Sequence, residues 1–445
     1  MRYLKLTPYR IVLIGFLFIT VIGTVLLMRP FASADRHAQS FVDALFVAAS
    51  ALSTTGLSVV DVGQFYSFFG QIVILILFQI GGLGYMLLIA VVMQGLGIRL
   101  SLGGKLVLEE SFSTHPYKES FGFSTFVCII AFGFEFLGAV ALSIYWYRDY
   151  PLGHAIYLGI FHSVSSFCTA GFSLFPDNLC SYRDSIFVNV TLSILSIAGC
   201  IGFPVLYDLL HTFFGKAPEE TFRRKLTVHT KLALCVLPIL FLVGWLFIVI
   251  SEWHTPYISF TDWLLTTSFQ TISTSTTTGF NTVDIGSLKM TGLMMMAVLM
   301  YIGAPAGGTG GGVKSTTIAV FLLSIFSTIS KKNELVIFNR RISYKIKDQA
   351  FAICAIAMLF IIVDLLILTM TEKASFLEIV FETFSAFGTV GLSAGITSSL
   401  SVPGKVMICM SMLAGRIGPL VIGYSIRGKT QPVPIKYPEG VLLIG

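Results

Sequence analysis

A nine-residue pattern of small and hydroxylated residues occurs four times in the 445-residue chain. Each copy follows the rule S-x-x-x-T-x-G-[LF]-[SN], and the copies occupy residues 50–58, 165–173, 273–281 and 385–393. Their glycines are separated by 115, 108 and 112 residues, and each glycine has a phenylalanine ten residues before it. A nearly constant period indicates an internal fourfold repeat.

The pattern contains groups that can bind a cation. Backbone carbonyls of several extended segments around one axis can replace the hydration shell of an ion. Glycine suits such a segment because it lacks a Cβ atom and adopts the angles that turn its carbonyl inward. The alternative is that the small residues only let helices pack closely. Recurrence with the same flanking features favours the cation site.

The composition shows which kind of chain carries these segments. Apolar residues make up 55% of the sequence and charged residues only 12%, about half the charged share of a soluble domain. Eight apolar runs reach the roughly 20 residues that cross a bilayer. They cover about 11–28, 70–95, 122–146, 186–207, 232–250, 290–328, 350–370 and 405–424. The chain is therefore predicted to be a polytopic membrane protein, and not a cytosolic enzyme, a secreted domain or a nucleic-acid-binding protein.

The first run could be mistaken for a signal peptide, because Ala32-Ser33-Ala34 follows it. Its apolar stretch of 18 residues exceeds the roughly 7 to 15 of a signal peptide. We expect a retained helix, which the fourfold repeat also requires.

Each copy of the pattern falls between an odd and an even run. Every repeat therefore contains two spans, so all four repeats have the same orientation. Of the 29 Lys and Arg residues, 22 are assigned to the side that holds both termini, counting Lys314 and Arg416, which lie within runs. This excess predicts cytoplasmic termini. The expected fold is an all-α polytopic membrane protein with four parallel helix–pore-loop–helix repeats around one central ion pore. The repeats are expected at residues 1–95, 96–210, 211–330 and 331–445.

Capping patterns predict short re-entrant helices before the copies. Ser40 and Ser375 each precede an acid by three residues and their glycine by 16 residues, which resembles a capping box. Ser259 lies 20 residues before its glycine, so the third helix should be about one turn longer. The second repeat lacks the box. The negative C-terminal end of each helix dipole would face the Thr-x-Gly segment.

The even runs carry glycines in pairs. Three pairs are spaced three residues apart, namely Gly81/Gly84, Gly199/Gly202 and Gly415/Gly418. The third of these even runs, at 290–328, instead contains six glycines and a proline between Gly303 and Thr317, which a straight helix does not tolerate. Lys314-Ser315 suggests a phosphate loop, but Val313 stands where that motif requires glycine, so nucleotide binding is disfavoured.

Charged residues inside the apolar runs include Glu135, Asp364 and Arg416. Arg416 either faces a water-filled path or extends to the interface, because a charge at the bilayer centre is unfavourable. Glu135 and Asp364 belong to no motif, and we expect them to accept hydrogen bonds between helices. Glu109, Glu110 and His115 are expected on a solvated loop.

The seven cysteines are scattered, without a Cys-x-x-Cys pair or histidines at metal spacing. This predicts neither a metal site nor disulfides.

Over all eight runs the chain resembles the membrane subunits of bacterial Ktr potassium-uptake systems, in the Trk/Ktr/HKT superfamily of cation transporters. The resemblance implies a selectivity filter that binds potassium. The filter residues are Thr54, Thr55, Gly56, Thr169, Ala170, Gly171, Thr277, Thr278, Gly279, Thr389, Val390 and Gly391. In the superfamily, serine at the first filter glycine accompanies sodium preference, so Gly56 implies potassium preference.

The resemblance also implies that the glycine-rich break at 303–317 is an intramembrane gate below the filter, with Arg416 as an electrostatic barrier. The implied gate and barrier residues are Gly303, Ala304, Pro305, Ala306, Gly307, Gly308, Thr309, Gly310, Gly311, Gly312, Lys314 and Arg416.

Regulation by nucleotide would need another chain, since no cytoplasmic loop shows a dinucleotide-binding pattern. The resemblance implies a homodimer in a bacterial plasma membrane, surrounded by lipid. It also implies a cytosolic octameric ring that binds ATP, ADP or NAD, and no cofactor in this chain. The basic loop 331–347 and the tail after Arg427 would contact the ring, unless their charges serve only topology.

Two other classes compete with this interpretation. A secondary transporter built from inverted repeats would reverse successive repeats, whereas these are parallel. An enzyme is disfavoured because no run carries paired His, Glu or Asp at helical spacing. A sodium-permeable member of the same superfamily stays an alternative.

Overall fold

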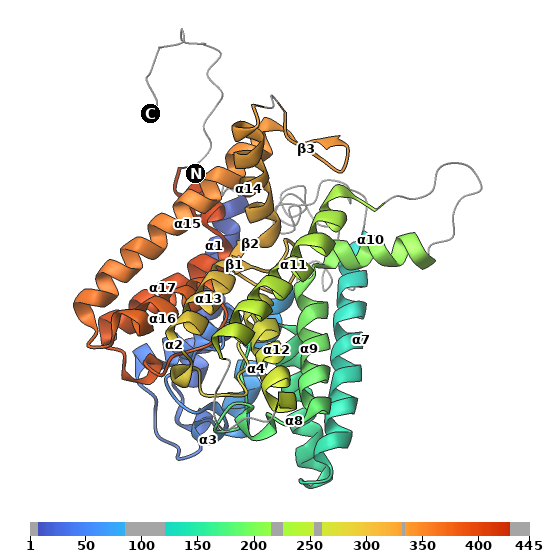
Figure 1. Cartoon of the computed structure of the whole chain (residues 1–445). Coiled ribbons are helices and arrows are strands. Elements are labelled where there is room, and N and C mark those ends of the chain that lie inside the picture. The colour runs from blue at the N-terminus through green and yellow to red at the C-terminus, as the bar shows by residue number, and fades with distance from the viewer. Residues whose placement is uncertain (1–7, 85–120, 215–225, 253–259, 332–333, 428–445) are drawn as a thin grey trace.

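The computed structural model describes residues 8–84, 121–214, 226–252, 260–331 and 334–427, and this part of the chain is mostly helical (Figure 1). Four helices are long and apolar enough to cross a membrane, and they coincide with the first, third, fifth and seventh predicted runs. These are α1 (Pro8–Leu27), α7 (Phe121–Trp146), α11 (Val228–Ser251) and α15 (Tyr344–Thr371).

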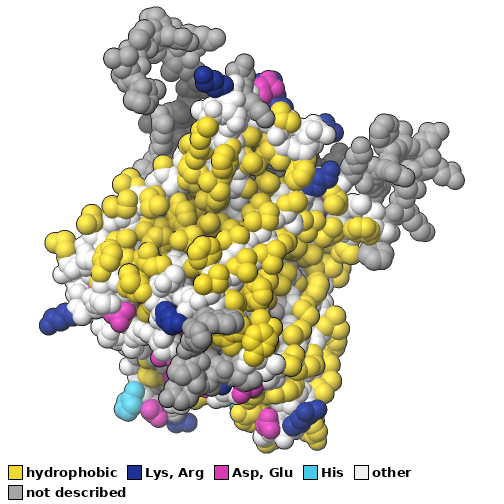
Figure 2. Space-filling view, viewed as in Figure 1, with side chains coloured by type: hydrophobic (Ala, Val, Ile, Leu, Met, Phe, Trp, Pro, Cys, Tyr) yellow, Lys and Arg dark blue, Asp and Glu magenta, His cyan; other side chains and the backbone are white. Residues whose placement is uncertain are grey.

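The four long helices present apolar side chains to the surroundings, among them Phe18, Phe136, Leu246 and Leu359. Figure 2 shows apolar side chains over the middle of the molecule and charged side chains towards its upper and lower ends. This distribution matches a protein whose middle lies in the hydrocarbon core of a bilayer.

A short helix precedes each copy of the nine-residue pattern. These helices are α2 (Phe41–Leu52), α8 (Leu152–Phe167), α12 (Phe260–Ser275) and α16 (Phe376–Gly388). The capping box predicted at Ser375 and Glu378 is present in full, whereas α8 begins after Pro151 without a side-chain cap. Helix α12 has 16 residues against 12 in α2, as expected, and Ser259 lies outside the described residues.

The fourth and eighth runs are bent, whereas we predicted one span for each of them. Helices α9 (Ile186–Cys200) and α10 (Phe203–Phe214) meet at a bend of 93°, and α17 (Val402–Ile417) and α18 (Pro419–Arg427) meet at 95°. If each bent pair is one span, the described residues contain up to six candidate spans by length and composition, fewer than the eight expected.

The glycine at each bend supplies the physical reason. Gly202 and Gly418 have φ of 103° and 93°, a left-handed region that ends a helix at little cost only for glycine. A proline follows each glycine, at Pro204 and Pro419. The second run forms α4 (Phe68–Leu83), and the rest of that run lies outside the described residues.

The sixth run is broken as expected, but over slightly different residues. Helix α13 (Met290–Tyr301) ends before β1 (Ile302–Gly303), which pairs in parallel with β2 (Val313–Lys314). Helix α14 (Ser315–Ile329) begins directly afterwards. The break therefore covers residues 302–314, and Ser315 to Thr317 are already helical. The parallel pairing brings the two ends of the intervening loop together.

The short helices and the inner helices form a closed circle. In order, α2, α4, α8, α9, α12, α13, α16 and α17 each pack against the next, and α17 packs against α2. The ends of the described chain also meet, because Arg10 Nε donates a hydrogen bond to Ser425 O at 2.9 Å. The first repeat is therefore next to the last.

The remaining described elements are short. They comprise α3 (Val62–Phe65), the 3-10 helices η1 (Pro30–Ala32), η2 (Cys180–Tyr182), η3 (Ile285–Ser287) and η4 (Thr397–Ser399), and the antiparallel pair β3 (Val336–Ile337) and β4 (Arg340–Arg341).

Candidate functional site

The four Thr-x-Gly segments share one backbone conformation. Their threonines have φ between 50° and 57°, at Thr54, Thr169, Thr277 and Thr389. Their glycines have φ between 64° and 96°, at Gly56, Gly171, Gly279 and Gly391. A β-branched residue rarely adopts the left-handed region. Its occurrence at all four equivalent threonines shows that the same local fold is imposed four times.

The first serine of each copy holds this conformation. Its carbonyl accepts a hydrogen bond from the amide five residues later at 2.8 to 2.9 Å in every copy. Its hydroxyl also bridges the segment. Ser50 Oγ accepts from Gly56 N at 3.1 Å, and Ser165 Oγ donates to Phe172 O at 2.8 Å. The sequence pattern contained this serine, but its role was not foreseen.

The glycines bring the four segments into contact in cyclic order. A Cβ atom added to each glycine would lie 1.9 to 2.5 Å from a carbonyl oxygen of the neighbouring segment. The glycine–carbonyl pairs are Gly56 with Ala170 O, Gly171 with Thr278 O, Gly279 with Val390 O, and Gly391 with Thr55 O. Because the last pair returns to the first segment, the four segments form a closed ring of backbone, to which all twelve predicted filter residues belong.

The paired glycines explain how the inner helices approach this ring. A Cβ atom at Gly81, Gly199 or Gly415 would lie 1.8 to 1.9 Å from the carbonyl oxygen of Leu52, Phe167 or Phe387 respectively. Each of these carbonyls lies four residues before the glycine of a Thr-x-Gly segment. The first glycine of each pair therefore allows close packing against the end of a short helix, and the second ends its own helix.

The glycine-rich loop contacts the threonine side of the ring. Thr169 Oγ1 donates a hydrogen bond to Thr309 Oγ1 at 3.2 Å, and Gly311 N donates to Thr277 Oγ1 at 3.3 Å. A Cβ atom at Gly311 would lie 2.0 Å from Thr389 Oγ1. The loop thus touches the threonines of three segments.

The loop is also bound to the bend between α9 and α10. Thr309 N donates to Gly199 O, and Phe203 N donates to Gly307 O, both at 3.0 Å. The loop is therefore fixed from two sides, by the ring and by the bend.

Two cationic side chains lie at the loop. Arg416 donates hydrogen bonds to Thr309 O and Gly81 O, and to Gly82 O at 3.3 Å. Lys314 Nζ donates to Gly310 O at 2.6 Å. Within the described part of the chain, no ion pair involves either residue. The Arg416 guanidinium thus faces carbonyl oxygens of the loop and of α4.

The two intramembrane acids accept hydrogen bonds between helices, as expected. Gln79 Nε2 donates to both carboxylate oxygens of Glu135 at 2.9 and 3.1 Å, and Ser411 Oγ donates to Asp364. The seven cysteines are free. Among the described residues, no group of three His, Cys, Asp or Glu side chains could hold a metal. Glu109, Glu110 and His115 lie outside the described residues.

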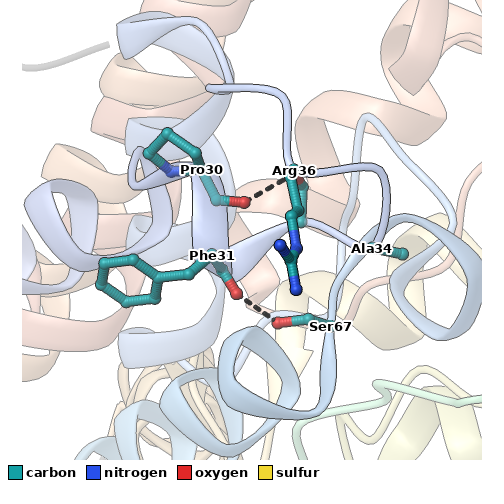
Figure 3. Close-up of a pocket in the computed structure, with 6 residues that line it drawn as sticks. Pro30, Phe31, Ala34, Arg36 and Ser67 are labelled. Carbon is teal, nitrogen blue, oxygen red and sulfur yellow. Dashed lines mark hydrogen bonds between the residues drawn. The ribbon is translucent and has the colours of Figure 1, made fainter.

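A separate surface pocket lies beside η1. Its lining residues are Pro30, Phe31, Ser33, Ala34, Arg36 and Ser67 (Figure 3). Ser67 Oγ donates to Phe31 O at 2.7 Å across it. It shares no residue with the ring or the loop, so it is not part of the candidate site.

The long apolar helices and the backbone ring define the class of the protein as a helical membrane protein. The TrkH family, described as cation transport protein, matches residues 6–427. The chain therefore belongs to this family of cation transport proteins.

Two curated relatives are similar over almost the whole chain. The Ktr system potassium uptake protein B of Bacillus subtilis is 38% identical, over 100% of this chain and 98% of the relative. The protein of the same name from Vibrio alginolyticus is 37% identical, over 98% and 94%. The crystal structure of the potassium transporter TrkH from Vibrio parahaemolyticus matches with a TM-score of 0.73 at 22% identity, over 95% of this chain and 86% of that one.

Proposed function

We propose that the chain is the membrane subunit of a potassium-uptake system in the plasma membrane of a bacterium. The observation that carries the proposal is the closed ring in which each filter glycine approaches a carbonyl oxygen of the neighbouring segment. Carbonyl oxygens arranged in this way replace the hydration shell of a potassium ion. The names of the curated relatives, which are potassium uptake proteins, support the same ion.

In this proposal, potassium binds at the twelve filter residues and passes along the axis of four parallel repeats at 1–95, 96–210, 211–330 and 331–445. The ion is the substrate, and the chain performs no covalent chemistry. Both termini are cytoplasmic, so the loop at 302–314 lies between the filter and the cytoplasm.

The loop acts as the gate, with Lys314 and Arg416 as the barrier. Support comes from the contacts of the loop with the filter threonines Thr169 and Thr277. A fixed positive charge in a low-dielectric path raises the energy of a passing cation. Movement of the loop would open the ion path and would also displace the positive charges of Lys314 and Arg416 from it.

Regulation comes from other chains. The proposed assembly is a homodimer on a cytosolic octameric ring that binds ATP, ADP or NAD. We place one contact with the cytosolic ring in the loop 331–347. The exposed side chains of Arg340 and Arg341, on the hairpin of β3 and β4, favour this placement. The tail after Arg427, outside the described residues, is the second proposed contact.

Uptake measured in bacterial cells that lack their own potassium transporters tests the proposal. Cells carrying the chain with its cytosolic partner should grow at low external potassium, and isotope uptake should be faster for potassium than for sodium. Cells with the empty vector are the control. Equal uptake of potassium and sodium would favour the sodium-permeable alternative. Potassium uptake that stops when the gradient of a second, coupled ion is removed would favour a secondary transporter.

A further inference from the structure

One position on the short helices is buried in all four repeats, yet its residue differs. It lies nine residues before each filter glycine and is occupied by Val47, His162, Gln270 and Glu382. All four side chains are at most 1% exposed. A buried polar side chain is costly unless it is hydrogen-bonded, so the partners of the three polar residues are informative.

Glu382 bonds to the chain that leaves the fourth filter segment. Its carboxylate accepts a hydrogen bond from Ser393 Oγ at 2.8 Å and another from Thr397 Oγ1. Ser393 lies two residues after the filter glycine Gly391, and its hydroxyl also accepts from Gly395 N at 3.0 Å. The carboxylate therefore connects α16 to the outer end of its own filter segment.

The second and third repeats contain the same connection with different chemistry. His162 Nε2 lies 3.1 Å from Ser173 Oγ and accepts from Leu174 N at 3.3 Å, while Nδ1 lies 2.9 Å from Leu158 O. Gln270 Nε2 donates to Thr282 Oγ1 at 3.2 Å. Leu158 belongs to α8 itself, whereas the other partners lie two or three residues after their filter glycines.

The first repeat lacks the connection, since Val47 has no polar atom. Ser58, the residue equivalent to Ser173 and Ser393, donates instead to Val60 O at 2.6 Å within its own turn. The outer end of the first filter segment is therefore held by fewer bonds to its short helix than the other three.

We infer that Glu382, Gln270 and His162 are positioning residues that fix the outer ends of three filter segments and thereby contribute to discrimination between potassium and sodium. None is placed within the carbonyl ring. A ring that cannot contract around the smaller sodium ion favours potassium, and hydrogen bonds to the exit of each segment oppose contraction. The inference rests on the proposed function, because it assumes that the ring conducts.

Glu382 offers the sharpest test because its carboxylate has two hydroxyl partners. Glu382→Val copies the residue of the first repeat and removes both bonds. Glu382→Gln keeps the shape and can still bond to both hydroxyls, so it should rescue the effect. The matched control is Glu372→Val. Glu372 also accepts hydrogen bonds from a serine, Ser401, but lies at the end of α15, away from the filter.

The measurement is the ratio of potassium to sodium flux in liposomes that contain the full-length chain. For Glu382→Val we expect the ratio to fall about fivefold, which corresponds to about 1 kcal/mol, the net value of one hydrogen bond. Glu382→Gln and Glu372→Val should keep the wild-type ratio. A purely structural role would lower both fluxes together and leave the ratio unchanged, which would overturn the inference.

Two further variants decide the matter if Glu382→Val does not insert. Ser393→Ala and Thr397→Val each remove one hydroxyl partner and should each lower the ratio by about twofold to threefold, a part of one hydrogen bond. An unchanged ratio in both would contradict the inference. Failure of the proposed function is distinguishable, because the wild-type chain itself would then show no potassium flux.

Discussion

The guanidinium group of Arg416 donates a hydrogen bond to the carbonyl oxygen of Thr309, which lies 107 residues earlier in the chain. The same guanidinium donates to Gly82 O at 3.3 Å. Arg416, on α17 of the fourth repeat, therefore joins the glycine-rich loop of the third repeat to α4 of the first. One side chain thus provides both a positive charge and a mechanical connection at the loop.

Arg416→Ala should leave the protein folded and raise cation flux. The substitution removes a fixed charge from the proposed path and releases Thr309, so both the electrostatic barrier and the attachment of the loop weaken. Flux in liposomes with and without the cytosolic partner measures the effect. Arg183→Ala is the control, because Arg183 pairs with the exposed Asp184 and should not affect flux. Failure of Arg416→Ala to insert or dimerise would indicate a structural role instead.

Gly56→Ser should weaken discrimination between potassium and sodium. At this position φ is 96° and a Cβ atom would lie 2.5 Å from Ala170 O, so the side chain must displace the carbonyl ring and adds a hydroxyl ligand. The ratio of the two fluxes in liposomes is the measurement. Gly133→Ser is the matched control, since nothing lies within 4 Å of a Cβ atom there. An unchanged ratio in Gly56→Ser would refute the filter assignment for the first repeat.

Deletion of Ala306 to Gly312 should raise flux and make it insensitive to partner and nucleotide. The deletion removes the contacts of Thr309 and Gly311 with the threonines of the Thr-x-Gly segments. Because β1 and β2 pair in parallel, the two residues that remain, Ala304 and Pro305, cannot connect them as they stand. The shortened loop must therefore give up this pairing, and the facing ends of α13 and α14 must adjust. Flux that fell to background in a correctly inserted variant would show that the loop builds the path and does not block it.

Glu135→Leu should destabilise the protein without changing its ion preference. The substitution leaves the amide of Gln79 without its two acceptor contacts, at a cost of about 1 to 3 kcal/mol for a buried unsatisfied group. Thermal unfolding in detergent measures the loss, and Glu135→Gln, which retains one acceptor oxygen, should lose less. A changed flux ratio at unaltered stability would contradict the structural role.

Much of the architecture was predictable because apolar length and small-residue periodicity are local properties of the sequence. The four long helices follow from hydropathy, and the capping residues Ser40 and Ser375 mark helix starts that the structure confirms. The partners of Glu135 and Asp364 were also expected to lie on other helices. The helix lengths and helix starts depend on residues that are near one another in the chain, whereas the partners themselves, Gln79 and Ser411, lie 56 and 47 residues away from their acids and could not be named.

The bends after Cys200 and Ile417 were missed, although their glycines were noticed. A glycine inside an apolar run is compatible with a continuous helix, and only its positive φ in the folded state shows that the helix ends there. The role of Ser50 and its equivalents was likewise hidden, because a serine hydroxyl can bond within a helix as readily as across a filter segment. Contacts between repeats, such as that of Arg416 with Thr309, depend on three-dimensional closure of the ring.

The meeting of α1 and α18 makes circular permutation of the chain feasible. Tyr9 and Tyr424 have ring centroids 5.0 Å apart, so a short linker could connect the chain at these two residues while new ends are opened between two repeats. Surface connections tolerate such breaks when the flanking elements stay packed. Any one of the four repeats could then be synthesised first. The order in which the repeats enter the membrane could therefore be changed while the cyclic order of the Thr-x-Gly segments stays the same.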